Sequence, residues 1–386
     1  LVENAAAELG YDPIELRRKN LVSSEQMPYP NAVGMTYDSG EYAKSMDMCM
    51  DLADWGGFET RKKEAESRGM LLGRGFANYV ESSIGTPREQ AEIHVRADGH
   101  IDLVIGTQPS GQGHETSFAQ VAAEWLGVPI NTISVIVGDT DLVKVGGGSH
   151  SGRSMRMAGT VIVKAADELI KKSKKLAAVV LEAAETDLEF HDGKFQVVGT
   201  DREISLYALA EVVGRRSDLP EKLSVIEDNV METPVFPNGC HICEIEIDPV
   251  SGAYKIARYT TVDDVGRAIN PLIVDGQTHG GIVQGAGEAL GELCAMDPES
   301  GQPLAGSFMD YHMPRADEYP SFKTELNEVP SPTNPLGVKA GGEGGTTPAL
   351  AVLVNGFVDA LRPFGVRDIQ MPVTPRKVWE LINQVR

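Results

Sequence analysis

The chain reads Gly337-Val338-Lys339-Ala340-Gly341-Gly342-Glu343-Gly344-Gly345-Thr346-Thr347-Pro348, and a run rich in helix-forming residues follows from Pro348 to Leu361. Five glycines in nine residues surround one carboxylate, Glu343. Glycines let a backbone approach a ligand closely, and the first turn of a helix presents free N–H groups and the positive end of its dipole. Glu343 is therefore either a solvated turn residue or a placed acid or base. Glycine-rich turns before helices are common, so this stretch alone does not decide between them.

The composition of the 386 residues limits the class of protein. The formal net charge is −21, which argues against nucleic acid or an anionic membrane as a partner, because both require a basic face. No apolar run approaches the ~20 residues that span a bilayer. The length suits two or three domains, and Leu1 to Gly10 reads as the middle of a helix, so we expect a fragment or processed piece of a longer polypeptide.

Two further glycine-rich stretches each follow an expected strand and open an expected helix. Gly106 to Thr116 follows a strand at 101–106, and Gly146 to Ser154 follows a strand at 133–137. Both stretches place backbone N–H groups and a helix dipole where a pyrophosphate could bind, with Gln, His, Ser and Arg side chains as further donors. Neither is a Walker loop, because no Gly-Lys-Ser/Thr follows.

A fourth stretch runs from Asp263 to Pro271 and continues to Gly287. Pro271 suits the first position of a helix, and Gln277, Gly281 and Gln284 then share one side of that helix. Such a row fits a polar ligand with several rings that lies against the helix. A close helix–helix crossing would also favour the glycines.

Strands and helices alternate along the whole chain, which predicts an α+β fold with mixed sheets and packed helices. Besides the elements named above, we expect helices over 1–21 (two, separated at Gly10), 41–54 (capped by Asp38 or Ser39), 154–185 and 204–213, and strands at 70–80, 91–96, 188–198 (a hairpin), 242–248 and 253–263. Cys240 and Cys243 should fall on opposite faces of their strand, which favours reduced buried thiols over a redox or metal site. Four histidines stand outside any motif and are expected to be structural or surface residues: His94, His100, His191 and His312.

Together the four stretches resemble the molybdopterin-binding large subunit of the molybdenum hydroxylases, the family of xanthine dehydrogenase, aldehyde oxidase and aerobic carbon monoxide dehydrogenase. The resemblance extends over essentially the whole chain and is specific in three segments: 111–116, 264–285 and 334–343. It implies the C-terminal half or so of that subunit, either a fragment or a natural half. Residues 1–68 would then end the preceding molybdopterin-binding domain and form a helical connection. Residues 69–386 would form the second such domain, with two interwoven α+β subdomains.

The resemblance also implies a cofactor and a base. The family holds molybdenum through the dithiolene of a pyranopterin, frequently as molybdopterin cytosine dinucleotide, and a glutamate beside the metal removes the proton of the attacking hydroxide. Glu343 matches that glutamate, whose pKa a dry pocket would raise, and no metal ligand is expected from this chain. Lys339 is either a cofactor contact or a surface lysine. The remaining positions that match cofactor contacts are Gln112, Gly113, His114, Thr116, Gly152, Arg153, Ser154, Asn270, Gln277 and Gln284.

The partners follow from the same resemblance. They are the N-terminal half of the large subunit, an iron–sulfur subunit and an FAD subunit, in a cytoplasmic dimer of heteromers that in some cases associates with the inner face of the membrane. We expect an oxidoreductase that is inactive without them, acting on an aldehyde or an N-heterocycle. Carbon monoxide is an alternative substrate, although it requires a copper-binding cysteine outside this chain. A non-catalytic half that only completes the cofactor site is another alternative. A generic nucleotide-binding enzyme is disfavoured, because no G-x-G-x-x-G strand–helix unit is present.

Overall fold

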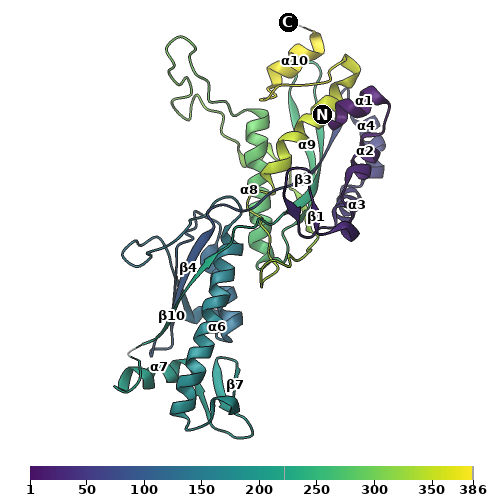
Figure 1. The fold of residues 1–386 in the computed structure, drawn as a ribbon. Coiled ribbons are helices and arrows are strands. Elements are labelled where there is room, and N and C mark those ends of the chain that lie inside the picture. The colour runs from purple at the N-terminus through teal and green to yellow at the C-terminus, as the bar shows by residue number, and fades with distance from the viewer. Residues whose placement is uncertain (221, 385–386) are drawn as a thin grey trace.

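The structure, a computed structural model, describes residues 1–220 and 222–384 and consists of two lobes (Figure 1). The first lobe contains both ends of the described chain, and the second is an excursion of the chain between β3 and β11. Each lobe has its own mixed sheet covered by helices. The expected α+β fold is confirmed.

The first lobe is built on a sheet with the strand order β13 (Lys323–Leu326), β12 (Tyr254–Asp264), β11 (Asn238–Ile247) and β3 (Leu71–Val80). β11 runs antiparallel to both of its neighbours, whereas β12 and β13 are parallel. Every residue of β11 is buried, because helices cover both faces of the sheet. The helices are α3 (Tyr42–Leu52) and α4 (Phe58–Ser67) on one face, and α9 (Thr346–Leu361) with α8 (Pro271–Leu290) on the other.

The cysteines of β11 show how the sheet separates two cores. Cys240 packs with Cys49 of α3, while Cys243 lies in the core with Phe357 of α9. Both thiols are free and buried, and they lie on opposite faces as the strand period predicts. The acidic residues of the same strand are also buried, and Arg61 of α4 lies 2.6 Å from Glu244.

The close contact between β3 and α9 depends on Gly75, and its replacement gives a test of this packing. A Cβ atom on Gly75 would lie 1.8 Å from the carbonyl oxygen of Val352. We expect Gly75→Ala to lower the free energy of unfolding of the full chain by at least about 1–3 kcal/mol, measured by urea denaturation. The matched control is Gly214→Ala in helix α7 (Leu206–Arg215), where nothing lies within 4 Å of the added atom. This control should stabilise the chain by about 0.5–1 kcal/mol; equal effects of the two variants would contradict the packing argument.

The second lobe is built on a sheet with the order β10 (Leu223–Val230), β4 (Arg88–Val95), β5 (Ile101–Ile105) and β6 (Ile133–Ile136). Helices α5 (His114–Leu126) and α6 (Ser154–Val180) share one hydrophobic core with this sheet. A smaller sheet of β7 (Leu188–His191), β8 (Lys194–Val197) and β9 (Glu203–Ser205) packs nearby with α7. The hairpin expected at 188–198 is confirmed, and β4 and β5 form another antiparallel pair.

The helices of the first 68 residues begin and end largely where the sequence predicts. Asp12 caps α2 (Pro13–Asn20) by accepting from the N–H groups of Ile14 and Glu15, and Gly10 ends α1 (Val2–Leu9) in the left-handed region. Asp38 and Ser39 do not cap α3: its N-cap is Glu41, without a side-chain hydrogen bond. Since α3 and α4 pack on the first sheet, these residues share a core with the later chain. The domain boundary at residue 68 stays a prediction.

Three further boundaries differ from expectation. Helix α6 ends at Val180 rather than near Glu185, β9 occupies the start of the helix expected at 204–213, and β11 begins four residues before Ile242. The C-terminal helix is α10 (Pro375–Asn383). In the described part of the chain, no helix combines the length and the apolar character that crossing a membrane requires.

Candidate cofactor-binding site

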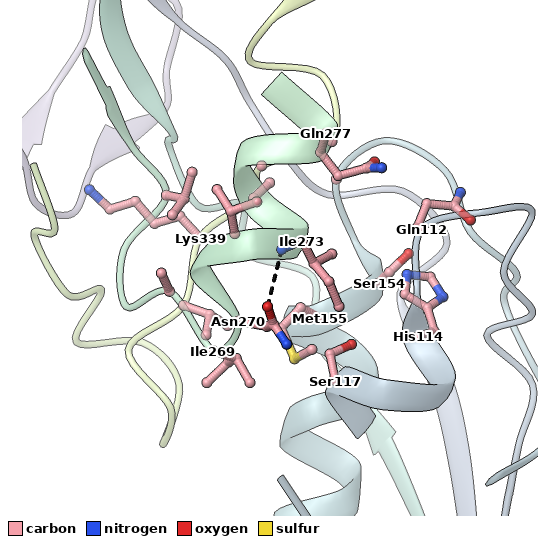
Figure 2. Close-up of a pocket in the computed structure, with 18 of the residues that line it drawn as sticks. Gln112, His114, Ser117, Ser154, Met155, Ile269, Asn270, Ile273, Gln277 and Lys339 are labelled. Atoms are coloured by element: carbon pink, nitrogen blue, oxygen red, sulfur yellow. Dashed lines mark hydrogen bonds between the residues drawn. The ribbon is translucent and has the colours of Figure 1, made fainter. Parts of the chain in front are cut away.

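A cavity of about 270 Å³ lies where the two lobes meet, and all four glycine-rich stretches of the sequence reach it (Figure 2). The second lobe contributes the starts of α5 and α6 with the loops before them. The first lobe contributes the start of α8 and the segment from Val338 to Glu343. The predicted site residues that line the cavity are Gln112, His114, Gly152, Ser154, Asn270, Gln277, Lys339 and Glu343.

Two helices of the second lobe begin at the cavity. Gly113, with φ +71°, precedes α5, and Arg153 precedes α6; neither provides a side-chain cap. The positive ends of both helix dipoles are therefore available to an anion. His114 opens α5 with its Nδ1 atom 3.3 Å from the Ser149 hydroxyl, and burial lowers the pKa of His114, which favours a neutral donor and acceptor at pH 7.

Asn270 joins the two lobes at the edge of the cavity. Its side-chain oxygen accepts from the N–H of Ile273 and caps α8, while its amide donates to Gln120 of α5 over 2.9 Å. Pro271 takes the first helical position as predicted. The starts of α8 and α5 are thus fixed to each other by one side chain.

The polar row on α8 serves two purposes rather than one. Gln277 faces the cavity, where a Cβ atom on Gly342 would meet only the Gln277 side-chain oxygen, at 3.9 Å. Gly281 lies at the crossing with α9, because its added Cβ would lie 3.0 Å from Gly345. Gln284 lies outside the cavity lining and accepts a hydrogen bond from Thr346. The close helix crossing accounts for Gly281, whereas the contact of Gln277 with a ligand stays a prediction.

The Arg153 side chain is held by groups of this chain, and its expected contact with the cofactor stays a prediction. Its guanidinium is fully buried, forms an ion pair with Glu89 at 2.9 Å and donates to the backbone oxygens of Thr86, Arg88 and Gly148. These contacts fix the loop before α6 against β4. Thr116 is exposed on α5 and, with Gly113, does not line the cavity.

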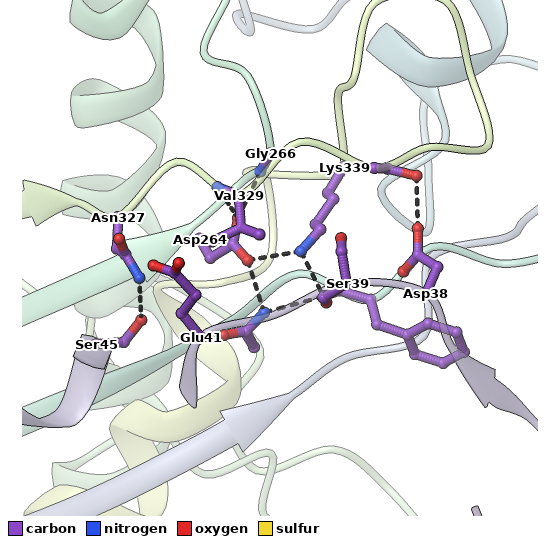
Figure 3. A network of polar contacts seen from close by, with 12 residues as sticks. Asp38, Ser39, Glu41, Ser45, Asp264, Gly266, Asn327, Val329 and Lys339 are labelled. Carbon is purple, nitrogen blue, oxygen red and sulfur yellow. Dashed lines mark hydrogen bonds and ion pairs between the residues drawn. The ribbon is translucent and has the colours of Figure 1, made fainter. Parts of the chain in front are cut away.

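Lys339 is not a surface lysine, because it is buried, and its contact with the cofactor stays a prediction. Its ammonium points away from the cavity (Figure 2) and lies 2.6 Å from Asp264 and 3.1 Å from the backbone oxygen of Ser39 (Figure 3). Both members of the ion pair are fully buried. Asp264 also accepts from the N–H groups of Gly266 and Val329. Burial raises the pKa of Asp264, and Lys339 opposes that shift. The pair ties the segment before Glu343 to β12.

Glu343 lies at the rim of the cavity, just before α9. Its backbone oxygen accepts from the N–H groups of Thr346 and Thr347. A Cβ atom on Gly344 would lie 2.5 Å from the Tyr79 hydroxyl, so the glycine allows the loop to approach β3. The Glu343 side chain is exposed, so this chain alone does not form the dry pocket that the sequence led us to expect.

One residue of this site escaped the sequence analysis. Glu81 follows β3, two residues after Tyr79, whose hydroxyl lies against Gly344, the neighbour of Glu343. Burial, and next the contact with Glu343, raise the pKa of Glu81 to about 8. The two residues are 262 positions apart and Glu81 belongs to no glycine-rich stretch, so the sequence carried no signal for their pairing.

The four histidines set aside at the outset do not line the cavity, and each lies beside an acidic partner: Glu92, Asp98, Glu189 or Glu318. Among residues 1–220 and 222–384, no group of three or more His, Cys, Asp or Glu is arranged to hold a metal ion. What the cavity offers is amides, hydroxyls, two imidazoles, the Arg267 side chain and helix ends around one carboxylate.

The family model and the related proteins that match this chain indicate the same family. Residues 48–320 match the family described as "Molybdopterin cofactor-binding domain". The chain is 30% identical to the carbon monoxide dehydrogenase large chain of Hydrogenophaga pseudoflava, over 100% of this chain and 50% of that protein. It is 34% identical to the nicotine 6-hydroxylase large subunit of Paenarthrobacter nicotinovorans, over 98% of this chain and 48% of that protein.

Solved structures agree with this. Quinoline 2-oxidoreductase from Pseudomonas putida 86 superposes with a TM-score of 0.91 at 30% identity, over 100% of this chain and 51% of that one. The carbon monoxide dehydrogenase from Oligotropha carboxidovorans gives a TM-score of 0.91 at 32% identity, over 99% of this chain and 50% of that one. The chain thus spans about half the length of the relatives that it matches. It belongs to the molybdenum hydroxylase family, as part of a molybdopterin-binding large subunit.

Proposed function

We propose that this chain is the half of a molybdenum hydroxylase large subunit that supplies the general base, Glu343, to an enzyme that hydroxylates an aldehyde or an N-heterocycle with oxygen from water. The observation that carries the proposal is that Glu343 lines the same cavity as Gln112, His114 and Gln277. A carboxylate beside neutral donors, at a rim lined by glycines, suits a base next to a bound cofactor.

The residues present fit a pyranopterin dinucleotide. The starts of α5 and α6 suit its phosphates, while Gln112, Gln277 and Asn270 can hydrogen-bond the ring system. Gly342 leaves space on the cavity side, because a Cβ there would contact only Gln277. When bound, the molybdenum group would supply the oxidising centre that accepts two electrons from the substrate. The cytosine dinucleotide form is part of the proposal.

The chain's own residues would bind and orient the cofactor and would remove a proton during the reaction. Glu343 would take up, at a side-chain oxygen, the proton that hydroxylation of the substrate releases. The start of α9 follows within a few residues and holds the backbone of Glu343, whose carbonyl oxygen accepts from the N–H groups of Thr346 and Thr347. The buried Lys339–Asp264 pair holds the loop four residues before the base. Exclusion of water from Glu343 is left to residues outside this chain.

The partner that would close the cavity is the other half of the large subunit. Relatives about twice as long support this, as does an arm between α8 and β13 that projects from the first lobe (Figure 1). The arm carries apolar side chains that the described residues leave uncovered, with Phe308 85% and Met309 93% exposed. The proposal also includes an iron–sulfur subunit and an FAD subunit as partners, in a dimer of such heteromers with a cytoplasmic location. Without these partners we expect the chain to be inactive.

The names of the relatives favour an N-heterocycle, since two of them act on nicotine or quinoline. Carbon monoxide dehydrogenases are similar to this chain to a comparable degree, so metal content is the deciding measurement. We expect about one molybdenum per chain, and no copper, in the complex purified with its native partners. If copper were found in an equal amount, we would propose carbon monoxide as the substrate in place of an N-heterocycle. A complete complex without molybdenum would overturn the proposed function.

A further inference from the structure

We propose that Glu81 is a positioning residue for Glu343: as a neutral carboxylic acid, it donates a hydrogen bond to the Glu343 carboxylate and fixes its direction. The inference rests on the proposed role of Glu343 as base, and it assigns a second carboxyl group to that site. Glu81 does not line the cavity, so it acts through Glu343 rather than on a substrate.

The backbone holds Glu81 in place. Its N–H donates to the carbonyl oxygen of Pro237 over 2.9 Å, and Ser83, two residues later, is paired with Val235 in both directions. The Ser83 hydroxyl is 3.4 Å from the Oε1 atom of Glu81. The segment after β3 is therefore anchored to the segment before β11, and Glu81 projects from a fixed position.

The same segment is wedged between two of the glycine-rich stretches. A Cβ atom on Gly152 would lie 2.5 Å from the Ser83 hydroxyl and 2.6 Å from the Ala340 side chain. Two residues before Glu81, Tyr79 contacts Gly344, the residue after Glu343. Contacts on both sides thus fix the distance between Glu81 and the loop of the base.

The state of the pair follows from its surroundings. The Oε2 atom of Glu81 is inaccessible to solvent and has no hydrogen-bond partner among the described residues. Two carboxylates in contact cannot both be ionised cheaply, so they share a proton. Glu81 is the more buried of the two, and a buried carboxyl favours its neutral form, so the proton resides there. The titratable groups that face Glu81 are Glu343 and Tyr79, and burial holds the pKa of Tyr79 well above its usual value. Among the residues that the structure describes, no cation contributes to the pKa of Glu81.

Infrared difference spectroscopy of the assembled holoenzyme tests the shared proton directly. We expect a protonated carboxyl band that disappears as pH rises through about 8, the pKa of Glu81, and that is absent in Glu81→Gln. In Glu343→Gln the same band should disappear at lower pH, because the neighbouring negative charge is gone. A titration that Glu81→Gln leaves unchanged, or the absence of any carboxyl titration near pH 8, would overturn the proposal.

Kinetics separate positioning from a merely structural role. Glu81→Leu, which cannot donate, should lower kcat about 10- to 100-fold with little change in KM, as expected for one lost hydrogen bond to a charged group. Glu81→Gln retains a donor, so it should recover most of that loss and abolish the fall in kcat above pH 8. Glu66→Gln on the surface of α4 is the control. Failure of both variants at every pH would indicate a structural role. If Glu343→Gln keeps its kcat, the proposed function fails, while the infrared titration still reports on the pair.

Discussion

Replacing Glu343 by glutamine in the assembled enzyme should lower kcat by at least about 100-fold and by up to about 10⁴-fold, the usual contribution of a general base. Glutamine keeps the size and the hydrogen-bonding capacity of the side chain but cannot accept the proton. The contacts that we assign to the cofactor come from Gln112, His114, Asn270 and Gln277, so the molybdenum content should stay at the wild-type level.

The paired measurement of turnover and metal content makes this result specific. A variant that lost molybdenum together with activity would show that Glu343 holds the cofactor instead of acting as the base. A variant that kept both would show that the chain completes the site without taking part in the reaction, which is the alternative of a non-catalytic half. Glu66→Gln, at an exposed glutamate on α4, controls for the loss of one negative charge.

The sequence predicted those parts of the fold whose cause is local. Asp12-Pro13 and Asn270-Pro271 start helices because a capping side chain and a proline act within one turn, and both starts are where they were expected. Glycine-rich stretches mark helix starts for another local reason, because glycine allows the turn before the helix, as at Gly113 with φ +71°. Local rules do not predict that all four stretches reach one cavity. That expectation came from the family resemblance.

The roles of single polar side chains were harder to predict, because they depend on distant partners. Lys339 and Asp264 are 75 residues apart, and Arg153 and Glu89 are 64 apart, so their ion pairs appear only once the sheets are assembled. Both basic residues stand beside glycine-rich stretches in sequence, yet each holds its loop in place through a buried ion pair. Glu81 is the reverse case: it lies beside the base in space and far from it in sequence.

Lys339→Met should reduce the free energy of unfolding of the full chain by about 3–5 kcal/mol, the usual cost of removing one partner from a buried ion pair. Methionine roughly matches the length of the lysine side chain, so the loss reflects Asp264, whose carboxylate would remain buried without a counter-charge. Urea denaturation measures the change, and Lys63→Met, at an exposed position on α4, is the control that should stay within about 0.5 kcal/mol of wild type.

The dependence of this loss on pH identifies its cause. Burial already raises the pKa of Asp264 above its unfolded value, and removal of Lys339 raises it further. A carboxyl with a raised native pKa contributes stability that is present at low pH and is lost as pH rises through that pKa. The deficit of Lys339→Met should therefore be largest at neutral pH and shrink in acid. Adding Asp264→Asn should cost less than the sum of the single variants, since it removes the stranded charge. A deficit that is the same at both pH values, with additive variants, would mean that lysine packing, rather than the ion pair, holds the loop of Glu343 in place.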